Sequence, residues 1–158
     1  MADTSLQPLI FDASSHANQV FSTGDIAAYL NVSLNEVDYW VRCKLLSPSI
    51  RKGSGHGSRR LFGHSDVMQA VLIHRLRIAK WKPRQIEVAL TAIAKAIRNP
   101  LMVQTPLLIH EKNVLLILCR EKSKELMLLD AASPGQYVMV IALDTLEEET
   151  RTSLARSK

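Results

Sequence analysis

The spacing of apolar residues predicts two short helices joined by a tight turn. The first helix begins at Ser22 or Thr23, both good N-caps, and apolar side chains follow at helical spacing. Asn31 suits a left-handed turn position, and Ser33 suits the N-cap of the second helix. The second helix ends before Pro48, which cannot continue it. Its predicted buried side consists of Leu34, Val37, Trp40 and Val41. The pattern therefore predicts a helix-turn-helix.

Two further helices are predicted after a glycine-rich interruption. Three glycines within residues 53–57, flanked by cations, forbid a stable helix and favour a basic hairpin or loop. The third helix begins at His64 or Ser65, with Asp66 near its positive end. Its predicted buried residues are Val67, Val71, Leu72, Leu76, Ile78 and Ala79. The fourth helix begins near Pro83 and has an apolar stripe that suits either an intramolecular core or a short dimer seam. This stripe consists of Ile86, Leu90, Ile93 and Ile97.

The pattern changes after residue 100 to short apolar runs separated by polar turns, which is typical of strands. Strands are predicted at residues 107–109, 114–119, 125–129 and 137–143. A last helix is predicted from about residue 143 to 155, because Asp144 and Thr145 with the glutamates that follow offer capping-box chemistry. The fold class is therefore α+β, with a helical N-terminal part and a small strand-rich part that ends in a helix.

Positive charge is concentrated in one part of the chain. The whole chain of 158 residues carries a net charge of +5 at pH 7. Residues 40–84 contain eleven basic residues and a single acid, Asp66, so this stretch has an excess of ten positive charges. The remaining residues are net acidic by five charges. Such an asymmetry is expected when one module meets a polyanion and the other does not.

The basic stretch combines a helix-turn-helix, a cationic glycine-rich loop and a basic third helix, which together predict a winged helix-turn-helix. In such a module the second helix meets base edges in the major groove, and wing cations neutralise phosphates. Asn35 suits adenine and Glu36 suits cytosine, while Tyr39 and Arg42 suit phosphate oxygens. The predicted DNA-binding residues are Ser33, Asn35, Glu36, Tyr39, Arg42, Lys44, Arg51, Lys52, His56, Ser58, Arg59 and Arg60.

Residues 21–48 resemble the opening of the MerR family of transcription regulators. In that family a Gly-Glu-Val-Ala helix is followed by Gly-Val-Ser and then by Tyr-Tyr-x-Arg-x-Gly-Leu-Leu, and this chain aligns with it without a gap. Residues 59–62, Arg-Arg-Leu-Phe, are similar to the Tyr-Arg-Leu-Tyr end of the family's wing. Residues 64–67 are similar to the start of its Asp-capped third helix. The resemblance covers roughly residues 21 to 97.

The resemblance implies a homodimer on a palindromic promoter site of double-stranded DNA. It implies that Arg60 is the wing arginine and that Tyr39 and Arg42 contact the DNA backbone. Where the family often has Arg-Thr-Leu-Arg, this chain has residues 35–38, Asn-Glu-Val-Asp, and the two acids repel phosphate. The fourth helix is followed by strands in place of the family's long coiled coil, so a metal-sensing role is not transferred.

These observations give a domain plan and two hypotheses about function. The plan has a flexible tail at 1–19, a DNA-binding domain at 20–82, a linking or dimerisation helix at 83–99 and a C-terminal domain at 100–158. The first hypothesis is a dimeric DNA-binding regulator whose C-terminal domain binds an effector, a protein or a second copy. The alternative is a protein-interaction adaptor or antitoxin-like module that keeps the fold and binds DNA weakly or not at all.

Several other classes of function are not expected. No nucleophile, base or metal grouping predicts an enzyme, and no catalytic residue, metal or cofactor is predicted. No leader and no apolar stretch of membrane-spanning length is present, which predicts a cytoplasmic protein with no membrane partner. Cys43 and Cys119 lie in apolar surroundings without metal-ligand spacing, so both are predicted to be reduced and buried. Trp81 is predicted to be a core residue that closes the third helix.

Overall fold

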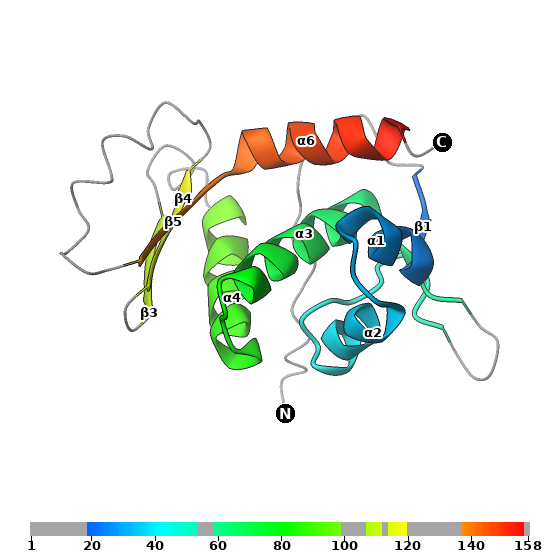
Figure 1. Ribbon diagram of the computed structural model, residues 1–158, viewed down its shortest axis with the longest axis horizontal. Coiled ribbons are helices and arrows are strands. Elements are labelled where there is room, and N and C mark those ends of the chain that lie inside the picture. Colours follow the sequence, from blue (N-terminus) through cyan, green and yellow to red (C-terminus); the bar gives the residue numbers. More distant parts are fainter. Residues whose placement is uncertain (1–18, 54–58, 99–106, 112–113, 120–136, 157–158) are drawn as a thin grey trace. The chain divides into compact units, whose positions relative to one another are not determined.

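The computed structural model describes residues 19–53, 59–98, 107–111, 114–119 and 137–156. The described part combines helices with a small sheet, so the predicted α+β class is confirmed (Figure 1). The chain divides into two compact units, Met1–Ala94 and Lys95–Lys158, which are described separately below. None of the helices within the described residues is both long and apolar enough to cross a bilayer.

The first unit begins with the predicted pair of helices. Helix α1 (Thr23–Leu30) is capped by Ser22, whose hydroxyl accepts from the backbone N–H of Asp25 at 3.2 Å. Asn31 ends this helix in the left-handed conformation, with φ 54°. Helix α2 (Leu34–Arg42) starts directly afterwards, and the hydroxyl of its N-cap Ser33 accepts from the N–H of Glu36 at 3.1 Å. The predicted helix-turn-helix and its caps are therefore confirmed.

Helix α3 (His64–Ile78) runs through the core of the first unit, and helix α4 (Pro83–Arg98) follows it after a short turn. The fully buried side chains include Trp40 of α2 and Phe62 before α3. Trp81, in the turn between α3 and α4, is also buried, as predicted. The residues of α4 that are buried in the single chain are Ile86, Ala89, Leu90 and Ile93. This part of the apolar stripe therefore serves an intramolecular core and is not free to form a dimer seam.

The side chain of Asp66 ties the loop after α2 to the start of α3. One carboxylate oxygen, Oδ2, accepts from the N–H of Gly63 at 2.8 Å, from the N–H of Ser49 at 2.8 Å and from the hydroxyl of Ser49 at 2.7 Å. Gln69, one turn further along α3, donates to the carbonyl of Leu45 at 2.6 Å. Both Asp66 and Gln69 are buried. Because buried hydrogen bonds to a carboxylate are short and strong, the loop is fixed against α3.

Two extended arms lead into and out of residues 54–58, which lie outside the described residues. Arg51 and Leu61 pair across the arms, with N···O distances of 3.1 and 2.9 Å for their two backbone hydrogen bonds. Strand β2 (Leu61–Phe62) also pairs antiparallel with strand β1 (Phe21–Ser22), which precedes α1. The arms are therefore anchored on one side to the start of α1. The term "arms" below means residues 50–53 and 59–62.

The second unit contains a three-stranded sheet and a helix. Strand β3 (Leu107–Glu111) pairs antiparallel with strand β4 (Val114–Cys119), and β4 pairs parallel with strand β5 (Tyr137–Ala142). Three of the four predicted strands are therefore confirmed, and the one at 125–129 lies outside the described residues. Helix α6 (Leu143–Arg156) follows β5 directly and buries one face that consists of Leu146, Thr150 and Leu154.

Five residues that were predicted to be buried are not: Leu34 and Ile78 are exposed, and Val41, Ala79 and Cys43 are half-buried. Leu34 was placed on the buried side of α2, yet its side chain is 55% exposed, because it stands in the first turn where the helix leaves the core. Ile78 was placed in the stripe of α3 but is 64% exposed at the end of that helix. Cys43 is a free thiol, as predicted, but is half-buried because it caps the end of α2 at the surface. The side chains of Ile97 and Cys119 lie outside the described residues.

Replacing Asp66 by alanine should destabilise the protein strongly. The change leaves three donors from Ser49 and Gly63 without their buried acceptor, and we expect a loss of about 3 kcal/mol in the free energy of unfolding, measured by urea denaturation. Asp25→Ala is the matched control, because Asp25 makes the same kind of cap with Ser22 at the exposed start of α1. Water replaces that acceptor, so the loss should be less than half as large; equal losses would contradict this account.

Candidate nucleic-acid interface

Helix α2 presents a row of polar side chains to solvent. Its buried side consists of Val37 and Trp40, which hold it against the core. Ser33, Asn35, Tyr39 and Arg42 are exposed on the remaining surface, and Glu36 and Asp38 are half-exposed. Because Val37 and Trp40 lie on one side of the helix, the helical period places Asn35, Tyr39 and Arg42 together on the opposite side, with Glu36 and Asp38 on its two flanks. The N-terminal half of α2 therefore offers amide, carboxylate and phenol groups at the surface.

The phenol of Tyr39 lies in a small polar cluster at the end of α2. The pKa of Tyr39 is raised chiefly by a hydrogen bond with the side chain of Cys43, one turn later. The positive charges of Arg77 and Arg42 act in the opposite direction but do not outweigh that bond. Tyr39 is therefore neutral at physiological pH and keeps its hydroxyl as a hydrogen-bond group. Arg77, at the end of α3, donates to the carbonyl of Trp81 at 3.1 Å, and its charge acts on the pKa of Tyr39.

The arms bring a second group of cations to the other side of α2. Arg51 and Lys52 are exposed on the first arm and Arg59 on the second. The Nε of Arg51 donates to the carbonyl of Arg59 at 3.0 Å, which adds a side-chain link to the backbone pairing between the arms. Arg60, next along the chain, directs its guanidinium toward α2 and forms an ion pair with Asp38. Asp38 therefore has a cationic partner on the protein and does not stand alone as a repelling charge.

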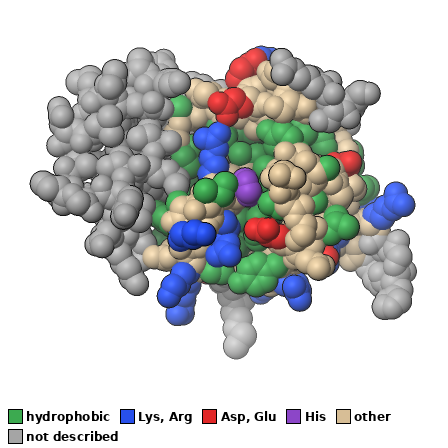
Figure 2. Space-filling view, viewed as in Figure 1, with side chains coloured by type: hydrophobic (Ala, Val, Ile, Leu, Met, Phe, Trp, Pro, Cys, Tyr) green, Lys and Arg blue, Asp and Glu red, His purple; other side chains and the backbone are tan. Residues whose placement is uncertain are grey.

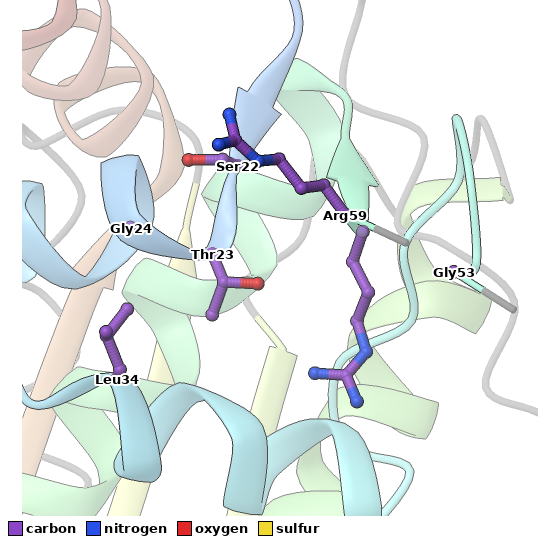
Figure 3. A pocket seen from close by; sticks show the side chains of 7 residues that line it. Ser22, Thr23, Gly24, Leu34, Gly53 and Arg59 are labelled. Atoms are coloured by element: carbon purple, nitrogen blue, oxygen red, sulfur yellow. The ribbon is translucent and has the colours of Figure 1, made fainter. Parts of the chain in front are cut away.

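A cavity of about 640 Å³ lies between the arms and the two helices of the helix-turn-helix (Figure 3). Its lining comes from the start of α1, the start of α2 and both arms (Figure 3). The lining residues are Ser22, Thr23, Gly24, Leu34, Gly53, Arg59 and Arg60. Leu34, which the sequence placed in the core, therefore forms part of this cavity wall. Two guanidinium groups beside a helix start give the cavity a positive character that suits an anion.

Arg77 belongs to a larger group of cations where α3 ends and α4 begins. Figure 2 shows Lys and Arg side chains gathered over this corner, on the face of the molecule where α2 also lies (Figures 1 and 2). The basic residues at the corner are Arg75, Arg77, Lys80, Lys82 and Arg84. Lys80 makes the turn possible by adopting a left-handed conformation, with φ 65°. The charge count over residues 40–84 contained these cations, but the predicted site did not, because only the fold brings the charge of Arg77 near enough to act on Tyr39 of α2.

The structure brings most of the predicted site residues onto the surface around α2 and the arms. The exposed ones are Ser33, Asn35, Tyr39, Arg42, Lys44, Arg51, Lys52 and Arg59. Glu36 and Arg60 are half-exposed. His56 and Ser58 lie outside the described residues. Within the described residues, no group of three or more His, Cys, Asp or Glu side chains is arranged to hold a metal ion.

Part of the chain is similar to known regulators. A segment of 45 residues is 38% identical to uncharacterized HTH-type transcriptional regulators of Mycobacterium bovis and of two strains of Mycobacterium tuberculosis. The match covers 28% of this chain and 20% of each relative, so the chain spans about a fifth of the length of the curated relatives it matches. No family model matches the chain. This similarity agrees with the helix-turn-helix formed by α1 and α2.

Replacing Cys43 by alanine should lower the pKa of Tyr39. The hydrogen bond and the charge interaction with the thiol both raise this pKa, and their loss leaves the opposing arginines. We expect the phenol to titrate at lower pH in Cys43→Ala than in the wild type, followed by the chemical shift of labelled tyrosine rings. Tyr39→Phe identifies the signal, and the signal of Tyr29 serves as the internal control. An unchanged titration of Tyr39 would contradict the contact with Cys43.

Proposed function

We propose that this chain binds double-stranded DNA as a transcription regulator, with a winged helix-turn-helix of MerR type at residues 20–82. The observation that carries the proposal is the position of α2, whose exposed half lies between the cations of the arms and those of the α3–α4 corner. A helix about 10–12 Å in diameter fits the major groove, and cations on both sides of it suit the phosphates that border that groove. In this proposal the protein acts by binding and has no catalytic step.

Each part of this surface has a distinct role in the proposal. Asn35 and Glu36, in the first turn of α2, meet base edges and supply sequence preference. Tyr39, Arg42 and the cations of the arms contact phosphates and fix the orientation of the helix. The cavity lined by Arg59 is suited to one phosphate of the backbone, because it joins guanidinium groups to the positive end of α1. The similarity to HTH-type regulators supports the same role.

We further propose that the protein works as a homodimer in the cytoplasm. A palindromic DNA site needs two copies of the recognition helix, because its half-sites are related by two-fold symmetry. The contact between copies uses a surface other than Ile86, Leu90 and Ile93, which are buried within one chain. The second unit, with its sheet and helix α6, is the proposed place for that contact, for an effector or for a protein partner.

A second candidate function is a protein-interaction adaptor that has kept the same fold. The observation in its favour is the ion pair between Asp38 and Arg60, because it neutralises a wing cation that the first candidate would use on DNA. On this alternative the exposed side of α2 contacts a protein. Dependence on salt separates the two candidates, since phosphate contacts release counterions and weaken steeply as salt rises.

Replacing Arg59 and Arg60 together by alanine should weaken binding to duplex DNA. Phosphate contacts position the protein without reading sequence, so affinity should fall about equally for all duplexes in a random pool. Because Arg60 is paired with Asp38, the double change should reduce the slope of log affinity against log salt by about 0.9 if only Arg59 contacts a phosphate, and by about 1.8 if both arginines do. Fluorescence anisotropy with labelled duplexes, over a series of salt concentrations, measures both quantities.

The matched control removes two exposed cations from the second unit, Lys95 and Arg151, so that the change in net charge is the same. This variant should bind DNA almost as the wild type does. If both double variants lose affinity equally, the effect follows net charge and not the arms. If the wild type shows no salt-dependent binding, the adaptor becomes the better candidate.

Replacing Asn35 by alanine should change sequence preference rather than general affinity. The side chain stands exposed in the first turn of α2, and a bidentate pair with adenine is worth about 1–3 kcal/mol against a wrong base. Selection from a random duplex pool should therefore show relaxed preference at one position in each half-site, while affinity for unselected DNA stays unchanged. If affinity falls equally for all duplexes and the selected sequence is unchanged, Asn35 contacts the DNA backbone and not a base, and the prediction is wrong.

A further inference from the structure

The ion pair between Asp38 and Arg60 joins the exposed side of α2 to the second arm. Nη1 of Arg60 donates to Oδ1 of Asp38, and the two residues are 22 positions apart in sequence. The side chains remain 33% and 42% exposed for Arg60 and Asp38, so both are within reach of a partner in solution. Arg60 also lines the cavity between the arms and the helix-turn-helix. The same guanidinium thus faces an acid of its own chain and a space suited to an anion.

A carboxylate and a phosphate compete for the same donors of an arginine. Both present two anionic oxygens that accept charge-assisted hydrogen bonds from the guanidinium fork, often two at once. While Asp38 holds Arg60, the pair is close to neutral and releases few counterions from DNA. Sequence-independent binding depends on the number of phosphates that cations neutralise. An arginine already paired on the protein contributes little to that number.

We propose that Asp38 acts as an internal competitor of DNA phosphate, holding Arg60 on the protein and thereby weakening sequence-independent binding to duplex DNA. This inference rests on the proposed function, because it assigns a role within the same surface. Arg59, beside Arg60, has no acid partner among the residues that the structure describes, and in this proposal it binds a phosphate. The ion pair therefore lowers the attraction of Arg60 to DNA phosphates, while the other cations of the arms stay in place.

The first test compares the full chain with its Asp38→Asn variant on a random-sequence duplex. Asparagine keeps the size of the side chain and removes the charge that holds Arg60. An exposed ion pair is worth up to about 1 kcal/mol, so Asp38→Asn should bind about fivefold more tightly. One further phosphate contact should steepen the slope of log affinity against log salt by about 0.9. Circular dichroism of both proteins checks that the fold is kept.

Two controls separate this mechanism from a simple loss of negative charge. Glu36→Gln removes one half-exposed acid from the same helix, away from Arg60, and it should give a smaller gain in affinity without the added slope. Asp38→Asn combined with Arg60→Gln should show a gain no larger than that of Glu36→Gln, because the cation to be released is absent. An equal gain with and without Arg60, or no gain in Asp38→Asn, would overturn the inference.

The outcomes also distinguish this inference from the proposed function. If the wild type binds duplex DNA and Asp38→Asn does not bind more tightly, the function stands and the inference fails. If the wild type does not bind but Asp38→Asn binds in a manner that needs Arg60, the inference stands and DNA binding by the natural chain fails. If neither protein binds duplex DNA at low salt, both are overturned.

Discussion

The buried carboxylate of Asp66 is the interaction on which the candidate surface depends. A single oxygen accepts from the backbone N–H of Gly63 and from both donors of Ser49, and so it holds together the two residues that flank the arms, at the start of α3. The acid also caps α3, which forms much of the core of the first unit. One buried group therefore sets both the direction of the central helix and the position of the arms. Asp66 is the only acid in residues 40–84, which carry ten excess positive charges even when it is counted.

The arms place Arg59 and Arg60 beside α2. Whether each arginine is available to a partner depends on whether an acid of the chain pairs with it. Arg59 and Arg60 line one cavity together, yet Arg60 also reaches Asp38 on the helix. On the opposite side, Arg77 from the end of α3 lies close enough to Tyr39 to influence its pKa. The surface of α2 is thus framed by cations from two elements that are distant in sequence. Asp38 on this surface pairs with Arg60 and so reduces the local positive charge. The number of cations alone therefore does not describe the surface.

Several features followed from local chemistry and were predicted from sequence. Ser22, Ser33 and Asn31 have side chains or backbone preferences suited to one position at a helix end, and they occupy those positions. The burial of Leu34 and Ile78 was predicted wrongly because helical spacing alone does not show where a helix leaves the core. The stripe on α4 fitted two roles equally well by its spacing. In the structure Ile86, Leu90 and Ile93 of this stripe are buried within one chain, so these side chains belong to the core and do not face a second copy.

The sequence by itself determined the helix-turn-helix, the strands at either side of residues 112–113, the α+β class and the concentration of positive charge. These depend on periodicity, caps and composition, which are local properties of the chain. Only the tertiary structure decided that Asp66 holds Ser49, that Asp38 pairs with Arg60 and that Arg77 approaches Tyr39. Each of these contacts joins residues from different elements. Spacing along the chain carries no information about such pairs, because their distance is set by how the helices and arms pack in space.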